Sequence, residues 1–133
     1  MTTCTAGAAL TRFAAAIDAQ DWAGLTALLA PGFTARYCHT GETFDAQTFV
    51  AFNRDYPGQW RFAAEIVVDG GPTAALRALV TDATGASSEA HYVATFGAVD
   101  AAGLLTSIDE VWAEVIAPPQ GERGPAAPVG GQS

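Results

Sequence analysis

Four strand-like runs follow one another in the second half of the chain, and this succession constrains the fold most. They cover residues 61–69, 73–83, 88–99 and 103–115, and short turns with the sequences GGP, TGAS and DAAG separate them. Long neighbouring strands joined by short turns predict an antiparallel meander. Apolar spacing and capping residues in the first half predict helices over 8–19, 22–29 and 46–56, with Asp21 and Asp45 as N-caps, and a strand over 33–40. Helices gathered before a late antiparallel sheet predict an α+β domain.

The length of 133 residues fits one domain with a substantial core. We expect a single domain over residues 1–116, followed by a flexible tail over 117–133, because that segment is rich in Pro and Gly. No apolar run approaches the roughly 20 residues that cross a bilayer. The N-terminus lacks a basic start followed by an apolar run, so a cytoplasmic protein is predicted.

Charge and cysteine content narrow the function classes. The net charge is −8 and the six basic residues are all arginine, so nucleic acid is a poor candidate partner. Cys4 and Cys38 form neither a metal-binding spacing nor a disulfide framework and are interpreted as reduced thiols. The abundance of Ala, Gly and Arg is typical of a GC-rich bacterial genome.

The last predicted strand, 103–115, raises a question about its two acids. Strand alternation puts Glu110 on one face with apolar neighbours and Asp109 on the other face, also beside apolar neighbours. Alternation alone therefore leaves open which carboxylate points into the protein.

The element order and the ending GLLTSIDEVWAE, with its Gly-x-Ile/Leu-x-x-Ile-x-Glu-x-Trp pattern, resemble the NTF2-like superfamily, and its SnoaL-like proteins fit best. The resemblance covers about residues 8–115. Residues 39–60, HTGETFDAQTFVAFNRDYPGQW, also resemble a bacterial NTF2-like group without a clear reaction. The resemblance implies a cystatin-like cone, in which N-terminal helices pack on a strongly curved, mainly antiparallel sheet around a pocket. The superfamily contains ketosteroid isomerases, polyketide cyclases, epoxide hydrolases, dehydratases and non-enzymes, so the fold alone does not select a reaction.

The resemblance implies that Glu110 points into the pocket and Asp109 points outward. In SnoaL-like cyclases and limonene-type epoxide hydrolases, an acid at the matching position removes a proton from a carbon or a water. Burial among apolar groups would raise the pKa of Glu110 toward neutrality, as a general base requires. The alternatives are that Glu110 only pairs with an arginine in a polar pocket, or that it faces solvent.

Arg77 and His91 are the candidates for assisting Glu110. Arg77 lies in the middle of a predicted strand, where it either supports Glu110 electrostatically or covers apolar neighbours at the surface. The epoxide hydrolases carry an Arg-x-Asp pair on the comparable strand, but Leu79 stands in the place of the aspartate, which argues against their full mechanism. The related group often has a histidine at the position of His91, and a neutral imidazole can donate to a carbonyl oxygen. No spacing of histidines and acids indicates a metal site.

Five further residues are candidate ligand contacts. The segment after the third predicted helix can line the mouth of a pocket and supply hydrogen bonds and aromatic surface. Trp60 has the alternative of simply packing the helix end onto the sheet. Tyr37 is not taken as a site residue, because residues 33–40 lack the acid that ketosteroid isomerases carry on an early strand. The predicted ligand contacts are His39, Asn53, Tyr56, Trp60 and Trp112.

Two functions remain in competition, beside a third reading in which the site is degenerate and supports no chemistry. The leading one is a SnoaL-like enzyme that acts by general acid–base catalysis, without a cofactor, on a small hydrophobic cyclic or carbonyl compound. The alternative is a non-catalytic module that binds a ligand or assembles with a protein partner. In both cases the resemblance implies a homodimer formed through the sheet face.

Overall fold

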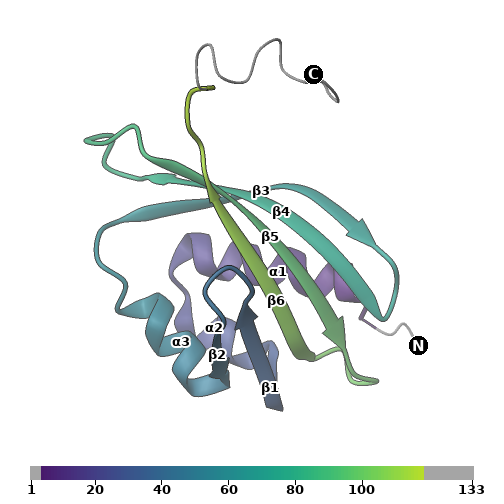
Figure 1. The fold of residues 1–133 in the computed structure, drawn as a ribbon. Coiled ribbons are helices and arrows are strands. Elements are labelled where there is room, and N and C mark those ends of the chain that lie inside the picture. The colour runs from purple at the N-terminus through teal and green to yellow at the C-terminus, as the bar shows by residue number, and fades with distance from the viewer. Residues whose placement is uncertain (1–3, 119–133) are drawn as a thin grey trace.

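A computed structural model describes residues 4–118 as a curved sheet with helices on its concave side (Figure 1). The elements are, in chain order, α1 (Ala6–Ala19), α2 (Trp22–Ala27), β1 (Leu29–Tyr37), β2 (Glu42–Asp45), α3 (Ala46–Arg54), β3 (Trp60–Asp69), β4 (Thr73–Asp82), β5 (Ala90–Val99) and β6 (Leu105–Glu114).

The six-stranded sheet has the order β2-β1-β6-β5-β4-β3. The strands β3 to β6 form the predicted antiparallel meander, each paired with the next along the chain. The strand β1 lies beside β6 and runs parallel to it, and β2 pairs with the outer edge of β1 as a hairpin. The predicted class, an α+β fold with a mainly antiparallel sheet, is therefore confirmed.

Irregular pairing bends the sheet over the helices. The register shifts within β3 between Ala64 and Ile66, and between β5 and β6 next to Ala98. Such bulges increase the local twist and bend a strand. The second shift also places Leu105 in the interior, although strict alternation from Glu110 would place it on the outer face.

The helices begin at the residues that the sequence indicates. The Asp21 carboxylate accepts from Gly24 N and caps α2. Asp45 and Thr48 form a reciprocal capping box at the start of α3. These contacts satisfy backbone N–H groups that have no partner inside the helix, and both predicted N-caps are confirmed.

Both ends of β1 were predicted wrongly. The strand β1 already begins at Leu29, within the predicted helix 22–29, and ends at Tyr37 instead of residue 40. Pro31 and Gly32 normally interrupt a strand, since proline lacks a ladder donor. Here the pairing of β1 with β6 shifts between Leu29 and Thr34, so the interruption is accommodated as a bulge.

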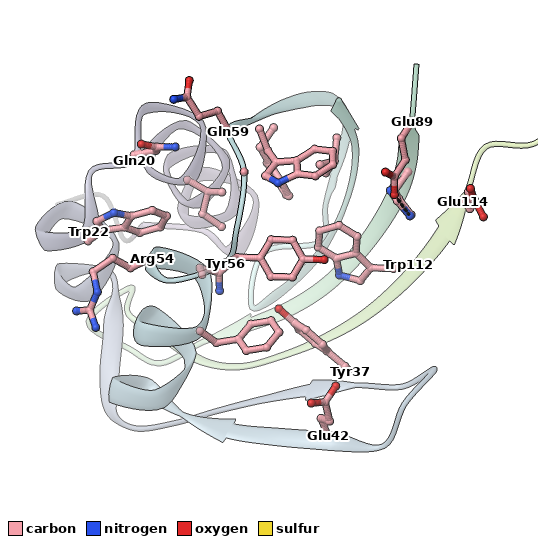
Figure 2. A pocket seen from close by; sticks show the side chains of 18 of the residues that line it. Gln20, Trp22, Tyr37, Glu42, Arg54, Tyr56, Gln59, Glu89, Trp112 and Glu114 are labelled. Atoms are coloured by element: carbon pink, nitrogen blue, oxygen red, sulfur yellow. Dashed lines mark ion pairs between the residues drawn. The ribbon is translucent and has the colours of Figure 1, made fainter. Parts of the chain in front are cut away.

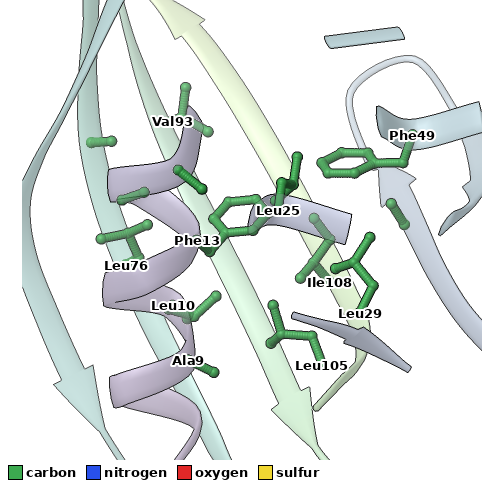
Figure 3. Close-up of a cluster of buried hydrophobic side chains, with 14 of the residues drawn as sticks. Ala9, Leu10, Phe13, Leu25, Leu29, Phe49, Leu76, Val93, Leu105 and Ile108 are labelled. Atoms are coloured by element: carbon green, nitrogen blue, oxygen red, sulfur yellow. The ribbon is translucent and has the colours of Figure 1, made fainter. Parts of the chain in front are cut away.

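The core lies between α1 and the concave face of the sheet (Figure 3). Leu10 and Phe13 project from α1 and are fully buried, and Leu76, Val93 and Ile108 come from the strands above them. The predicted tail, 117–133, lies almost wholly outside the described residues. Within residues 4–118, no helix has the length and apolar character needed to cross a membrane.

Candidate active site

Glu110 lies on the concave face of the sheet, as predicted. It is 2% exposed, whereas the neighbouring Asp109 is exposed on the convex face. Glu110 pairs with Thr95 of β5, which is also fully buried. Within the described residues, Glu110 and Thr95 are the two polar side chains of the interior. The fold therefore places one carboxyl group among described interior side chains that are otherwise uncharged.

Two neutral donors hold the Glu110 carboxylate. Thr95 Oγ1 donates to Oε2 over 3.1 Å, and the Trp112 indole Nε1 donates to Oε1, also over 3.1 Å. Burial raises the pKa of Glu110 to about 7, although the hydrogen bonds from Trp112 and Thr95 act to lower it. Because neither partner is charged, desolvation outweighs the hydrogen bonds. At neutral pH the group is divided between its two protonation states, which suits it to proton transfer.

Tyr37 lies next to Glu110 because β1 and β6 pair in parallel register at these two residues. Tyr37 is 5% exposed. Burial first, and the negative charge of Glu110 second, raise the pKa of this phenol above its ordinary value. Tyr37 is thus a neutral hydroxyl donor beside a buried acid. Tyr37 was not among the predicted site residues, and the parallel pairing that brings it to Glu110 leaves no local signal in the sequence.

A cavity of about 710 Å³ opens between the helices and the end of the sheet that carries Tyr37 and Trp112 (Figure 2). Its wall is largely aromatic, and the polar groups on it include the side chains of Gln20 and Gln59. Figure 2 shows Tyr56 and Trp112 facing each other across the cavity, with Tyr37 beside them. The aromatic lining residues are Trp22, Tyr37, Phe52, Tyr56, Trp60, Phe62 and Trp112.

Glu110 lies beneath this cavity rather than on its surface. Trp112 and Tyr37 line the cavity, and both also adjoin Glu110. The indole hydrogen bond to Oε1 therefore joins the wall of the cavity to the buried acid.

The five predicted ligand contacts all line the cavity. Asn53 projects from α3 and its amide donates to Phe49 O over 2.9 Å. Trp60 Nε1 donates to Pro57 O over 2.9 Å, so this indole both packs the loop and lines the wall. Their contact with a ligand stays a prediction. The residues are His39, Asn53, Tyr56, Trp60 and Trp112.

The structure contradicts the expected support of Glu110 by Arg77. Arg77 pairs with Ala94 of β5, and Ala94 pairs with Val111, so these three residues share the convex face. The Arg77 guanidinium is exposed, lies 3.3 Å from a carboxylate oxygen of Glu65 and stands 5.4 Å from the centroid of the Tyr92 ring. Arg77 therefore lies at the surface, as in the alternative in which it covers apolar neighbours there.

His91 lies on the concave face and lines the cavity. Its ring is 6.0 Å from that of Trp112, and its Nε2 atom is 3.7 Å from a carboxylate oxygen of Glu89. Within the described residues no hydrogen bond or ion pair joins His91 to Glu110, and Trp112 neighbours both. Within residues 4–118, no three His, Cys, Asp or Glu side chains come together as metal ligands.

Comparisons with known proteins agree with this architecture. The family of SnoaL-like domains matches residues 10–117, and the chain belongs to this family within the NTF2-like fold. No curated protein matches the sequence.

Three solved structures illustrate the similarity. A putative ketosteroid isomerase from Kribbella flavida is 26% identical with a TM-score of 0.77, covering 92% of this chain and 88% of its own. An NTF2-like protein of unknown function from Burkholderia xenovorans is 16% identical with a TM-score of 0.72, covering 86% and 87%. An epoxide hydrolase of the LEH-like type from M. tuberculosis is 13% identical with a TM-score of 0.67, covering 81% and 82%. The last two share the fold alone.

Proposed function

We propose that this protein is a SnoaL-like enzyme that transfers a proton on a small hydrophobic, ring-containing carbonyl compound bound in the cavity. The observation that carries the proposal is the buried Glu110, whose pKa is raised to about 7 directly behind the cavity wall. The similarity to a putative ketosteroid isomerase supports a reaction of this class. The cavity volume of about 710 Å³ suits a molecule of one to a few rings.

In the proposed reaction Glu110 accepts a proton from the carbon next to the carbonyl group. The neutral Tyr37 hydroxyl donates to the carbonyl oxygen, where negative charge develops as the proton leaves. Glu110 then returns the proton to the substrate, so no net proton is consumed. Since Trp112 covers Oε1, the substrate displaces its indole to bring the reacting carbon to the carboxylate.

Exchange of carbon-bound hydrogen for deuterium tests this proposal. Cyclic ketones, steroid enones and aromatic polyketide fragments are incubated with the protein in D₂O, and exchange next to the carbonyl is followed by NMR. Glu110→Gln should lower the exchange rate at least about 100-fold, because the amide cannot accept the proton. Tyr37→Phe should lower it by about 100-fold through loss of one oxyanion donor. In wild type, the rate should rise with pH and level off above a midpoint of about 7, since the base acts when deprotonated.

Asp109→Asn is the matched control, because it removes the neighbouring carboxylate from the convex face of the same strand. It should leave exchange unchanged. Wild-type exchange that survives Glu110→Gln would rule out Glu110 as the base.

The hydrogen bond from Trp112 to Glu110 favours one competing function, in which the protein binds a ligand and catalyses no reaction. In that case the cavity holds the ligand and Glu110 only orients the indole. Ketones would then raise the melting temperature of wild type and of Glu110→Gln equally, and neither protein would catalyse exchange.

We further propose that the protein works in the cytoplasm, and fractionation of the source cells would test this location. We also propose that the protein forms a homodimer through the convex face of the sheet. This face exposes large apolar side chains, and contiguous apolar surface of this kind is typical of interaction sites. They are Ile66, Val68, Tyr92, Phe96 and Val111. Phe96→Asp should reduce the mass found by sedimentation from two chains to one, whereas Ala101→Asp, in an exposed turn, should not. A monomeric wild type would refute the dimer.

A further inference from the structure

The charged groups that line the cavity are mostly of one sign. Glu42, Glu89 and Glu114 bring three carboxylates to its wall. In the described part of the chain, the guanidinium on this wall is that of Arg54, and it forms an ion pair with Asp55 over 3.0 Å. Glu89 lies 3.7 Å from Nε2 of His91, whereas no ion pair within the described residues involves Glu42 or Glu114, so the charge around the cavity is mainly negative.

The three carboxylates gather at one end of the cavity. Glu42 pairs with Tyr37 between β2 and β1, and Glu114 pairs with His91 between β6 and β5. Figure 2 shows Glu89 and Glu114 on the side of Trp112 and Glu42 beside Tyr37, whereas Arg54 lies at the opposite side of the view, next to Trp22. The acidic end is the end where Tyr37 and Trp112 cover the buried Glu110.

The same end carries a continuous aromatic wall. The Tyr37 ring lies 5.8 Å from Phe52 and 6.4 Å from Trp112, measured between centroids. Phe52 continues the contact to Tyr56 over 5.9 Å. The faces of such rings are electron-rich and attract a cation electrostatically, most strongly when it is removed from water. Aromatic faces bordered by carboxylates form a site suited to an organic cation and ill suited to an anion.

We infer that the ligand of this cavity carries a positively charged amine or quaternary ammonium group, which binds at the end formed by Tyr37, Trp112 and the three glutamates. The inference rests on the proposed function only in taking this cavity as the substrate site. It narrows the substrate class from neutral hydrophobic rings to ring compounds with a cationic substituent. The net charge of −8 also favours the approach of a cation.

Two probes of equal shape and different charge test the inference. Choline and 3,3-dimethylbutan-1-ol differ in one atom, a quaternary nitrogen in place of a carbon. Both are titrated into the full chain, and dissociation constants are taken from shifts of the tryptophan indole N–H signals in NMR spectra. Choline should bind at least about tenfold more tightly than the alcohol, because only the cation gains from the ring faces and carboxylates.

Matched variants on one strand then locate the effect. Glu114→Gln removes a carboxylate from the cavity wall, whereas Asp109→Asn removes one from the convex face. The first should weaken choline severalfold and the second should not. The combined variant Glu42→Gln, Glu89→Gln, Glu114→Gln should bring the preference for choline below about threefold, and Tyr56→Leu should also reduce it. Affinity for the alcohol should stay constant in all the glutamate variants.

The outcomes separate this inference from the proposed reaction. Equal binding of choline and the alcohol, or a preference that the combined variant retains, overturns the inference. If cyclic ketones exchange hydrogen for deuterium but choline does not bind, the proposed reaction stands and the inference of a cationic ligand is refuted. Preferential choline binding without exchange of any ketone would support the cation site and refute the reaction with neutral ketones. A protein that binds none of these probes would refute both.

Discussion

Replacing Glu110 by glutamine should stabilise the protein at pH 8 by about 3 kcal/mol and change its stability little at pH 4. In the folded state burial raises the pKa of Glu110 to about 7, above its ordinary value of 4.5. Folding therefore favours the protonated form. The cost of holding the charged form in the interior corresponds to about 1.4 kcal/mol for each unit of this difference. Glutamine avoids this cost while it can still accept from Trp112 and donate to Thr95.

The sign of the pH dependence follows from proton binding. Between pH 4.5 and 7 the folded state holds more protons on Glu110 than the unfolded state does, so the contribution of this group to stability is present below pH 4.5 and is lost as pH rises through 7. Urea unfolding of wild type and Glu110→Gln at several pH values measures the difference directly. The curve for the variant should lie above that for wild type at pH 8 and meet it near pH 4.

Glu114→Gln provides the control, since this exposed glutamate lies on the same strand and should show no such gain. A Glu110→Gln protein that is less stable than wild type at pH 8 would contradict the burial cost. A gain in stability together with a loss of exchange activity would indicate an acid that is retained for function at the expense of stability.

Phe13→Ala should be strongly destabilising, with a loss of about 3–5 kcal/mol in the free energy of unfolding. Phe13 is fully buried on α1, and its ring packs 6.0 Å from Phe49 and 6.4 Å from Phe62 between centroids. These partners come from α3 and β3, so one side chain joins three elements. Removing it loses apolar burial and leaves a cavity that the surrounding rings cannot fill.

Phe13→Leu separates the cavity from other effects, because it keeps an apolar side chain of intermediate size. Its loss should be clearly smaller than that of alanine, with the same dependence on urea. If Phe13→Ala cost less than about 1 kcal/mol, the ring would not be the link between α1, α3 and β3 that its contacts indicate.

The local sequence pattern was sufficient to predict most helices and strands, but it failed to predict the strand that contains Pro31. The alternation of β6 and the resemblance to the SnoaL-like proteins placed Glu110 inside, and the short turns predicted the meander. Pro31 and Gly32 suggested a break, but the pairing of β1 with β6 absorbs them in a bulge. That pairing joins segments distant in sequence, so no local window contains it.

The same contrast between local pattern and long-range pairing applies to the residues of the candidate site. The direction of Glu110 came from the resemblance to the SnoaL-like proteins, since alternation left it open. For Arg77 no such guide was used, and β4 is apolar on both faces around it, so the pattern gave no direction for that side chain. Strand register settles it, since Arg77 aligns with Ala94 and not with Thr95. Tyr37 was not proposed because its neighbour Glu110 lies on β6, which is distant from β1 in the sequence. Only the parallel pairing of these two strands brings the two residues together.

The parallel pairing of β1 with β6 also governs when the site can exist during synthesis. The first strand to be synthesised, β1, pairs with β6, the last of the described strands. Between them in the chain lie β2 and the meander strands β3, β4 and β5. Until β6 has left the ribosome, β1 has an open edge, and contacts between ends so far apart form slowly. No shorter nascent chain can bring Tyr37 and Glu110 together. The cavity floor is therefore assembled as a final step of folding, and a chain cut short before β6 would expose the unpaired edge of β1 to aggregation.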